Sequence, residues 1–145
     1  MKALALAAAS TAALFAAPAQ AETWNIFSAN DEQLFLLDLD SIAGGEAWSG
    51  DVSRSELPVE KPIALTHWVF DCGKRRAVID AMISNDEEGV IIENYDSKSD
   101  SMPVNPGSVM EHLMLAVCKG KYDPENTLPE GVSLSEIRET MRPGD

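Results

Sequence analysis

The chain has 145 residues, of which 45% are hydrophobic and 24% charged, an ordinary composition for a small globular protein. This composition argues against wholesale disorder, collagen-like repeats and a multi-domain enzyme. Asp and Glu total 24 against 11 Lys and Arg, so the formal net charge is −13 at pH 7. Nucleic acid is therefore a poor partner, because phosphate binding depends on clustered basic residues.

Residues 1–21 have the parts of a secretory signal peptide. Lys2 supplies a short basic region, residues 3–17 are small and apolar, and residues 19–21 read A-x-A, the form of a cleavage site. We expect cleavage after Ala21 and export to the bacterial periplasm or beyond. No cysteine precedes Cys72, so no lipoprotein is expected, and the apolar run is too short for a membrane anchor. We expect no membrane insertion after cleavage.

Alternating apolar and polar residues predict six short strands after the signal peptide. They fall at residues 24–27, 33–40, 46–55, 64–72, 75–84 and 90–95. Hairpin-sized turns separate most of them, which favours an antiparallel meander over βαβ winding. In the strand 33–40, alternation places Asp38 and Asp40 on a wet face. In the strand 64–72, it places Trp68, Phe70 and Cys72 on one face and His67 on the other.

One helix is predicted behind a loop at residues 96–105. Asn105 can cap it, Pro106 suits its first position, and Gly120 suits its end. An apolar stripe at helical spacing runs through it and ends in Cys118. Residues 122–145 are interpreted as a polar tail, in which capping-box spacing from Ser133 predicts a short helix. The sequence leaves open whether that helix docks or frays. The predicted divisions are therefore a signal peptide at 1–21, a folded domain at 22–121 and a tail at 122–145.

The chain has two cysteines, Cys72 and Cys118. In a small exported domain, an even pair most simply forms one disulfide. The alternatives are a redox pair, which is normally C-x-x-C, and a zinc site, which needs about four ligands. A disulfide would hold the helix across the sheet. The predicted fold class is α+β, a six-stranded antiparallel meander with one C-terminal helix packed on one face and tied by the disulfide.

The order of several features resembles a known family. A strand begins at Trp24, the run at residues 70–76 places Asp71 and Cys72 before basic residues, and a helix ends in Val117 and Cys118. From Trp24 to Lys119 this order resembles the surface-adhesin protein E family of bacterial envelope proteins. The resemblance implies a helix held on the concave face of a six-stranded sheet, and it implies adhesion to proteins. The surface-displayed member is a lipoprotein, whereas this sequence has no lipid-acceptor cysteine.

Two features are candidates for binding. Lys74, Arg75 and Arg76 form the only basic cluster after the signal peptide, and arginine suits bidentate contact with a carboxylate. The alternative is that these residues satisfy neighbouring acids such as Asp71 and Asp80. Trp48 lies on a polar strand, where an exposed aromatic side chain would mark a contact surface and a buried one would belong to the core.

An enzyme would have to start from His67 or His112, because histidine is the residue type best suited to acid–base catalysis near neutral pH. Neither lies in a nucleophile, phosphate-loop or metalloprotease motif, and both are interpreted as surface histidines. Asp38 with Asp40, and the acidic run at residues 96–100, are weak cation candidates that are read as solvated positions. No catalytic residue, metal ligand or cofactor is therefore predicted.

The sequence as a whole predicts an exported, non-enzymatic envelope protein that acts by adhesion-like protein binding, with an unknown protein partner and a homodimer possible. The first alternative is a small periplasmic hydrolase or metal-dependent enzyme that uses His67 or His112. The second is a carrier of a small ligand between helix and sheet, although Ala64, Ala77 and Ala81 leave no obvious space for one.

Overall fold

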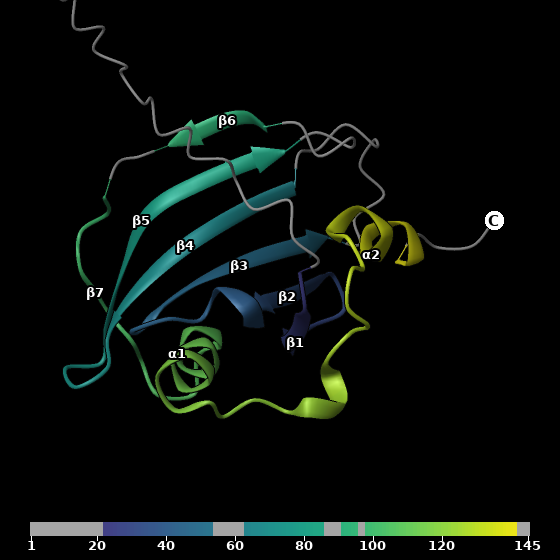
Figure 1. Ribbon diagram of the computed structural model, residues 1–145. Helices are drawn as coiled ribbons and strands as arrows, with labels where there is room; N and C mark the ends of the chain where they lie inside the picture. The colour runs from purple at the N-terminus through teal and green to yellow at the C-terminus, as the bar shows by residue number, and fades with distance from the viewer. Residues whose placement is uncertain (1–21, 54–62, 86–90, 96–97, 142–145) are drawn as a thin grey trace, which may run out of the picture.

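The computed structural model describes residues 22–53, 63–85, 91–95 and 98–141. The predicted antiparallel meander is confirmed, with its strands in sequence order across the sheet (Figure 1). The six strands are β1 (Trp24–Ala29), β2 (Gln33–Asp38), β3 (Glu46–Ser53), β4 (Ile63–Asp71), β5 (Arg76–Asn85) and β6 (Ile91–Tyr95). The segment predicted as a loop also contains a two-residue strand, β7 (Met102–Pro103), which pairs with the start of β5.

The end of β2 differs from the prediction. The strand stops at Asp38 and continues as a 3-10 turn, η1 (Leu39–Ser41), because the Asp38 carboxylate accepts a hydrogen bond from the backbone N–H of Asp40 at 3.0 Å. Asp38 is buried, whereas Asp40 is exposed. The expectation that both carboxylates share one wet strand face is therefore wrong.

The predicted helix is confirmed as α1 (Val109–Lys119), with Gly120 in the left-handed conformation at its end. Its cap is Ser108 and not Asn105. The Ser108 hydroxyl accepts from the backbone N–H of Glu111 at 3.2 Å, and Asn105 instead accepts through its carbonyl from Ser108.

The segment after α1 docks on the sheet. It contains a second 3-10 turn, η2 (Pro124–Asn126), and a short helix, α2 (Leu134–Thr140), which begins with the capping box of Ser133 and Glu136. The N–H of Leu128 donates to the carbonyl of Trp24 at 2.8 Å. This contact ties the segment to β1 and settles the question that the sequence left open, in favour of docking.

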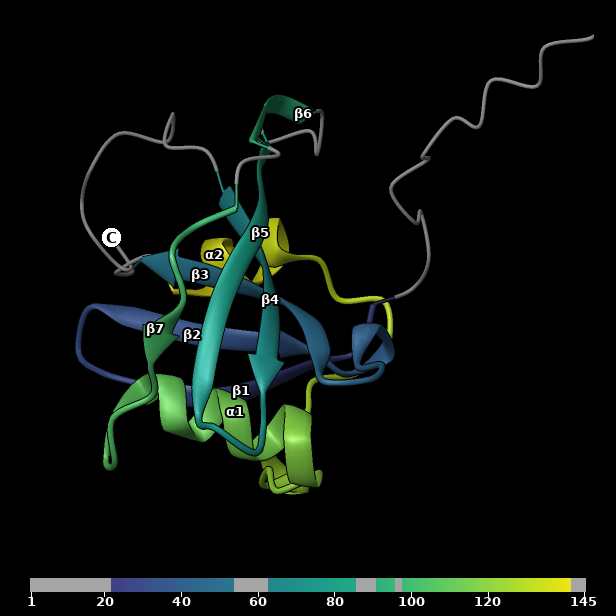
Figure 2. The same cartoon turned by 90° about the vertical axis from the view of Figure 1, so that its left-hand side faces the viewer.

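Both faces of the sheet are covered at β2. The neighbours Leu36 and Leu37 are each 0% exposed and point to opposite faces, into different apolar clusters. The Leu37 cluster packs against α1, and the Leu36 cluster packs against Leu134 and Ile137 of α2. Figures 1 and 2 show the two helices on different sides of the sheet. The core is therefore three layers deep on this side of the meander.

Glycine in β3 makes room for α2. A Cβ on Gly50 would lie 2.7 Å from a methyl carbon of Leu134, closer than two carbon atoms pack. Helix α2 therefore covers the part of its sheet face that lies around Gly50 of β3.

Candidate functional site

The remaining part of the α2 face, over the start of β3, the second half of β4 and the first half of β5, carries the candidate site. In β4, Trp68 and Phe70 pack into the α1 cluster, so strand alternation turns His67 and Val69 to the opposite face. Among the described residues, α1 and α2 cover other parts of the sheet. We call this surface the open-face patch and define it by six side chains: Glu46, Trp48, His67, Val69, Val78 and Asp80.

A histidine and a tryptophan form the centre of the patch. Trp48 and His67 are direct cross-strand partners, and their ring centroids lie 4.9 Å apart. Trp48 is half-buried, and its role in a contact surface stays a prediction. Cross-strand aromatic pairs stabilise antiparallel sheets, and this pair also fixes an aromatic surface that solvent reaches.

A β-bulge in β5 brings an acid to this histidine. His67 pairs with Ala81 and Trp68 pairs with Ile79, so Asp80 is an extra residue in β5. Ala81 and Asp80 consequently lie on the same face as His67, although strict alternation predicts opposite faces for them. The bulge therefore shifts the alternation of β5 side chains by one residue beyond Ile79.

The resulting contact is short. Asp80 Oδ1 lies 2.5 Å from His67 Nδ1. On the other side of the ring, Glu46 Oε2 lies 3.9 Å from His67 Nε2. The two carboxylates hold the imidazole between them, and their own side chains are 25% and 51% exposed for Asp80 and Glu46. The contact with Asp80 orients the ring and leaves Nε2 directed toward Glu46.

The patch continues into a hollow beside the disulfide. Val69 and Val78 are cross-strand partners and line a hollow of about 660 Å³ with the Gly44–Gly45 turn, Arg76 and Cys72. Gly45 has a φ of 84° and a Cβ there would lie 3.1 Å from the carbonyl oxygen of Phe70. Glycine is therefore required for the turn to lie this close to β4 and wall the hollow.

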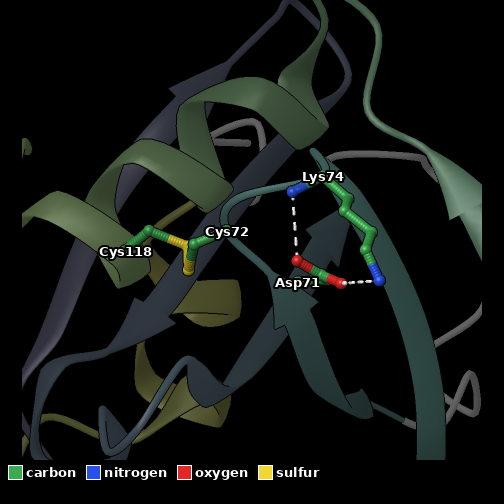
Figure 3. Close-up of a disulfide and its surroundings, with 4 residues drawn as sticks. All are labelled: Asp71, Cys72, Lys74 and Cys118. Atoms are coloured by element: carbon green, nitrogen blue, oxygen red, sulfur yellow. Dashed lines mark hydrogen bonds and ion pairs between the residues drawn. A yellow bond between two sulfur atoms is a disulfide. The ribbon is translucent and has the colours of Figure 1, made fainter.

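The predicted disulfide is present. Cys72 follows β4 and joins Cys118 near the end of α1, with the Cα atoms 5.9 Å apart (Figure 3). Of the residues described, none is a free cysteine. The bond fastens the β4–β5 turn to the C-terminal end of the helix and so fixes one wall of the hollow.

The basic cluster finds partners within the chain. Lys74 lies 3.4 Å from the Asp71 carboxylate, Arg75 donates to Glu111 of α1, and Arg76 donates to the hydroxyl and carbonyl of Ser101 at 2.7 and 2.6 Å. Of the acids expected to pair with the cluster, Asp71 does so. Binding of a ligand by these three residues stays a prediction, and Arg76 alone among them lines the hollow of the patch.

The second histidine lies elsewhere. His112 of α1 lines a separate groove of about 510 Å³ with Phe27, Leu115, Tyr122 and Asp123. The structure therefore does not bring the two histidines together.

The cation candidates gain no support from the described part of the chain. There, no three His, Cys, Asp or Glu side chains are grouped as a metal site. Of the acidic run at 96–100, residues 96 and 97 lie outside the described residues, and the hydroxyl of Ser99 accepts from the backbone N–H of Ile79 at 2.9 Å. Nor is any described helix both long and apolar enough to span a bilayer.

Sequence reasoning placed Trp48 in the site but read His67 as a surface residue and Asp80 only as a possible partner of the arginines. One signal was present. Aspartate is depleted in strand interiors, so an aspartate between Ile79 and Ala81 in an otherwise apolar run suggests a bulge or a functional contact.

Comparison with protein-family models, curated proteins and solved structures finds no match to this chain. The resemblance to the surface-adhesin protein E family therefore stays a prediction.

Proposed function

We propose that this protein is an exported, non-enzymatic envelope protein that binds another protein through the open-face patch, in an adhesion-like manner. The observation that carries the proposal is the patch itself. It presents a half-buried tryptophan, a pair of valines beside a hollow and two partly exposed carboxylates. The sheet that carries them is packed by α1 on one face and by α2 on the other. Binding hot spots are enriched in tryptophan and cluster on well-packed, rigid surfaces.

The disulfide supports export. Disulfides persist in oxidising compartments and are rare in the cytosol, so the Cys72–Cys118 bond fits a protein of the periplasm or the cell exterior. The expected signal peptide at residues 1–21 points the same way, and it lies outside the described residues.

The proposal is tested by site-specific photo-cross-linking in the producing cell. A photoreactive residue is placed at Val78, inside the patch, and a matched one at Glu125, on η2 beside β1. We expect a discrete protein adduct from position 78 that is absent from position 125. Two results would overturn the proposal. One is equal adducts at both positions, and the other is the absence of any adduct at position 78, both in cells and with extracted envelope or host proteins.

A second candidate function rests on the contact between His67 and Asp80. A carboxylate on Nδ1 orients an imidazole for proton transfer at Nε2, so the pair could act as the general base of a small hydrolase. Among the described residues, the ring nitrogens of His67 contact only carboxylates, so this candidate would have to activate water and not a nucleophilic side chain.

The two candidates respond differently to one substitution. If the protein is a hydrolase, His67→Gln abolishes turnover of a chromogenic ester or phosphoester that the wild type cleaves. If the protein only binds, the wild type shows no turnover above a heat-inactivated sample. That second result is the one we expect.

A further inference from the structure

We infer that the open-face patch takes a Lys or Arg side chain of its partner and, two residues later, an apolar side chain that enters the hollow at Val69 and Val78. This inference rests on the proposed function and names the chemistry of the partner segment. The occupant is an extended basic and apolar protein segment.

The first step of the argument is charge. The acidic groups of the patch, Glu46 and Asp80, face one another across His67 and have no Lys or Arg partner among the described residues. Arg76, the cation nearest in sequence to Asp80, lines the hollow but donates to the hydroxyl and carbonyl of Ser101. Lys74 pairs with Asp71, and Arg75 pairs with Glu111. Within the described part of the chain, both carboxylates are therefore without a Lys or Arg counter-ion and are available to a cation of a partner.

The second step is the aromatic ring. Trp48 lies between Glu46 and the α2 end of β3, with His67 directly opposite, and it is half-buried, so part of its ring is open to solvent. Tryptophan is the best aromatic partner for a cation, and a carboxylate beside the ring adds to the attraction. Arginine suits such a position because its planar group stacks on a ring and reaches a carboxylate at the same time.

The third step is spacing. Glu46 is the cross-strand partner of Val69, and Val69 is the partner of Val78. The hollow therefore lies directly beside the carboxylate along the line of strand pairs. An extended segment that lays a cation on Glu46 has the side chain two residues further on, which points to the same face, within reach of the two valines. Apolar burial there supplies affinity that a charge alone lacks.

The fourth step is the net charge of the whole chain. With a formal charge of −13, the chain attracts basic segments over a distance of about 8–10 Å at physiological salt and repels acidic ones. Long-range attraction and local contacts therefore select the same class of partner.

The test uses the purified exported protein and short synthetic peptides that place valine two residues after arginine, glutamate or citrulline, so that both side chains share one face of the extended peptide. Citrulline keeps the shape of arginine without its charge. We expect saturable binding of the arginine peptide that weakens as salt rises, weaker binding of the citrulline peptide and none of the glutamate peptide.

Substitutions in the patch locate the binding. Trp48→Leu should weaken arginine-peptide binding roughly threefold to thirtyfold, the span expected for a cation on a tryptophan ring. Glu46→Gln should weaken it as well, and because the Glu46 side chain is 51% exposed, this variant is expected to fold normally. Glu125→Gln removes the same charge from η2 and should leave binding unchanged.

Two results would overturn the inference. One is equal binding of the arginine and citrulline peptides. The other is an affinity that Glu46→Gln and Glu125→Gln lower equally, which would indicate general charge attraction only. If photo-cross-linking at Val78 captures a discrete partner while either of these results holds, the inference fails and the proposed function stands. If the arginine peptide binds as expected but no partner is captured in cells or extracts, the proposed function fails instead.

Discussion

Arg75, in the turn between β4 and β5, donates a hydrogen bond to Glu111, in the first turn of α1. Three residues before Arg75 in the same turn, Cys72 is bonded to Cys118 near the other end of that helix. One turn therefore holds α1 at both ends, by an ion pair at its start and a covalent bond at its end. Arg75 has a φ of 52°, so the turn places the arginine in the left-handed region that non-glycine residues seldom occupy.

The first prediction concerns Glu111. The backbone N–H of Gly107 and then the guanidinium of Arg75 lower the pKa of its carboxyl below the ordinary value of 4.5. A carboxyl with a lowered folded pKa stabilises the protein above its unfolded pKa and loses that contribution as pH falls through the folded pKa. We expect Glu111→Gln to lower Tm at pH 7 and to match the wild type once pH is below the folded pKa. Thermal melts across this range check the result, and a Tm difference that persists in acid would contradict it.

The second prediction concerns the disulfide. The bond joins residues 46 positions apart, and a loop of that length contributes about 4 kcal/mol in the chain-entropy model. The double substitution Cys72→Ser with Cys118→Ser should lower the free energy of unfolding in urea by about that amount. Reduction of the wild type should give the same loss. Alkylation followed by non-reducing mass spectrometry should label no thiol in the oxidised protein, and two labelled thiols would contradict the structure.

The third prediction concerns the docking of α2. Leu134 is 7% exposed and packs into the cluster around Leu36. Truncation of a buried leucine leaves a cavity, so Leu134→Ala should cost about 2–5 kcal/mol in urea denaturation. Thr140→Ala, near the exposed end of the same helix, is the matched control and should cost well under half of that. Equal small effects would show that residues 122–141 act as a loose tail.

The fourth prediction concerns Asp38. Burial raises the pKa of its carboxyl above 3.8. Burial, and after it the charge of Asp38, also raises the pKa of the nearby Glu22. A raised folded pKa means that the folded state holds its proton longer, so stability is lost as pH rises from the unfolded pKa through the folded one. Asp38→Asn keeps an oxygen to accept from Asp40 and carries no charge.

We therefore expect Asp38→Asn to melt at a higher temperature than the wild type at pH 7 and at the same temperature below pH 3.8. Asp40→Asn, at an exposed position two residues on, serves as the control for a general change in net charge. An Asp38→Asn protein that is less stable than the wild type at pH 7 would show that the ionised carboxylate is favourable in this place.

Local sequence patterns determined much of the fold. Period-two alternation with hairpin-sized turns predicted the six strands of the meander, and an apolar stripe that ends in Cys118, with Gly120 as the helix end, predicted α1. Two cysteines allow only one intramolecular pair, so Cys72–Cys118 followed once export was inferred. The strands and the helix depend on the spacing of residues that are neighbours in the chain, and the disulfide depends on the number of cysteines. A sequence displays both directly.

The tertiary structure alone decided which surface is open. Whether α2 docks depends on Gly50, more than eighty positions before Leu134, because the absence of a Cβ makes room for the helix. The placement of Asp80 beside His67 depends on a register shift between β4 and β5, and no local pattern of alternation encodes a shift of register. The sequence by itself determined an acidic, disulfide-bonded meander. Long-range packing and strand register decided that Trp48, His67 and two carboxylates meet on the part of the sheet that neither helix covers.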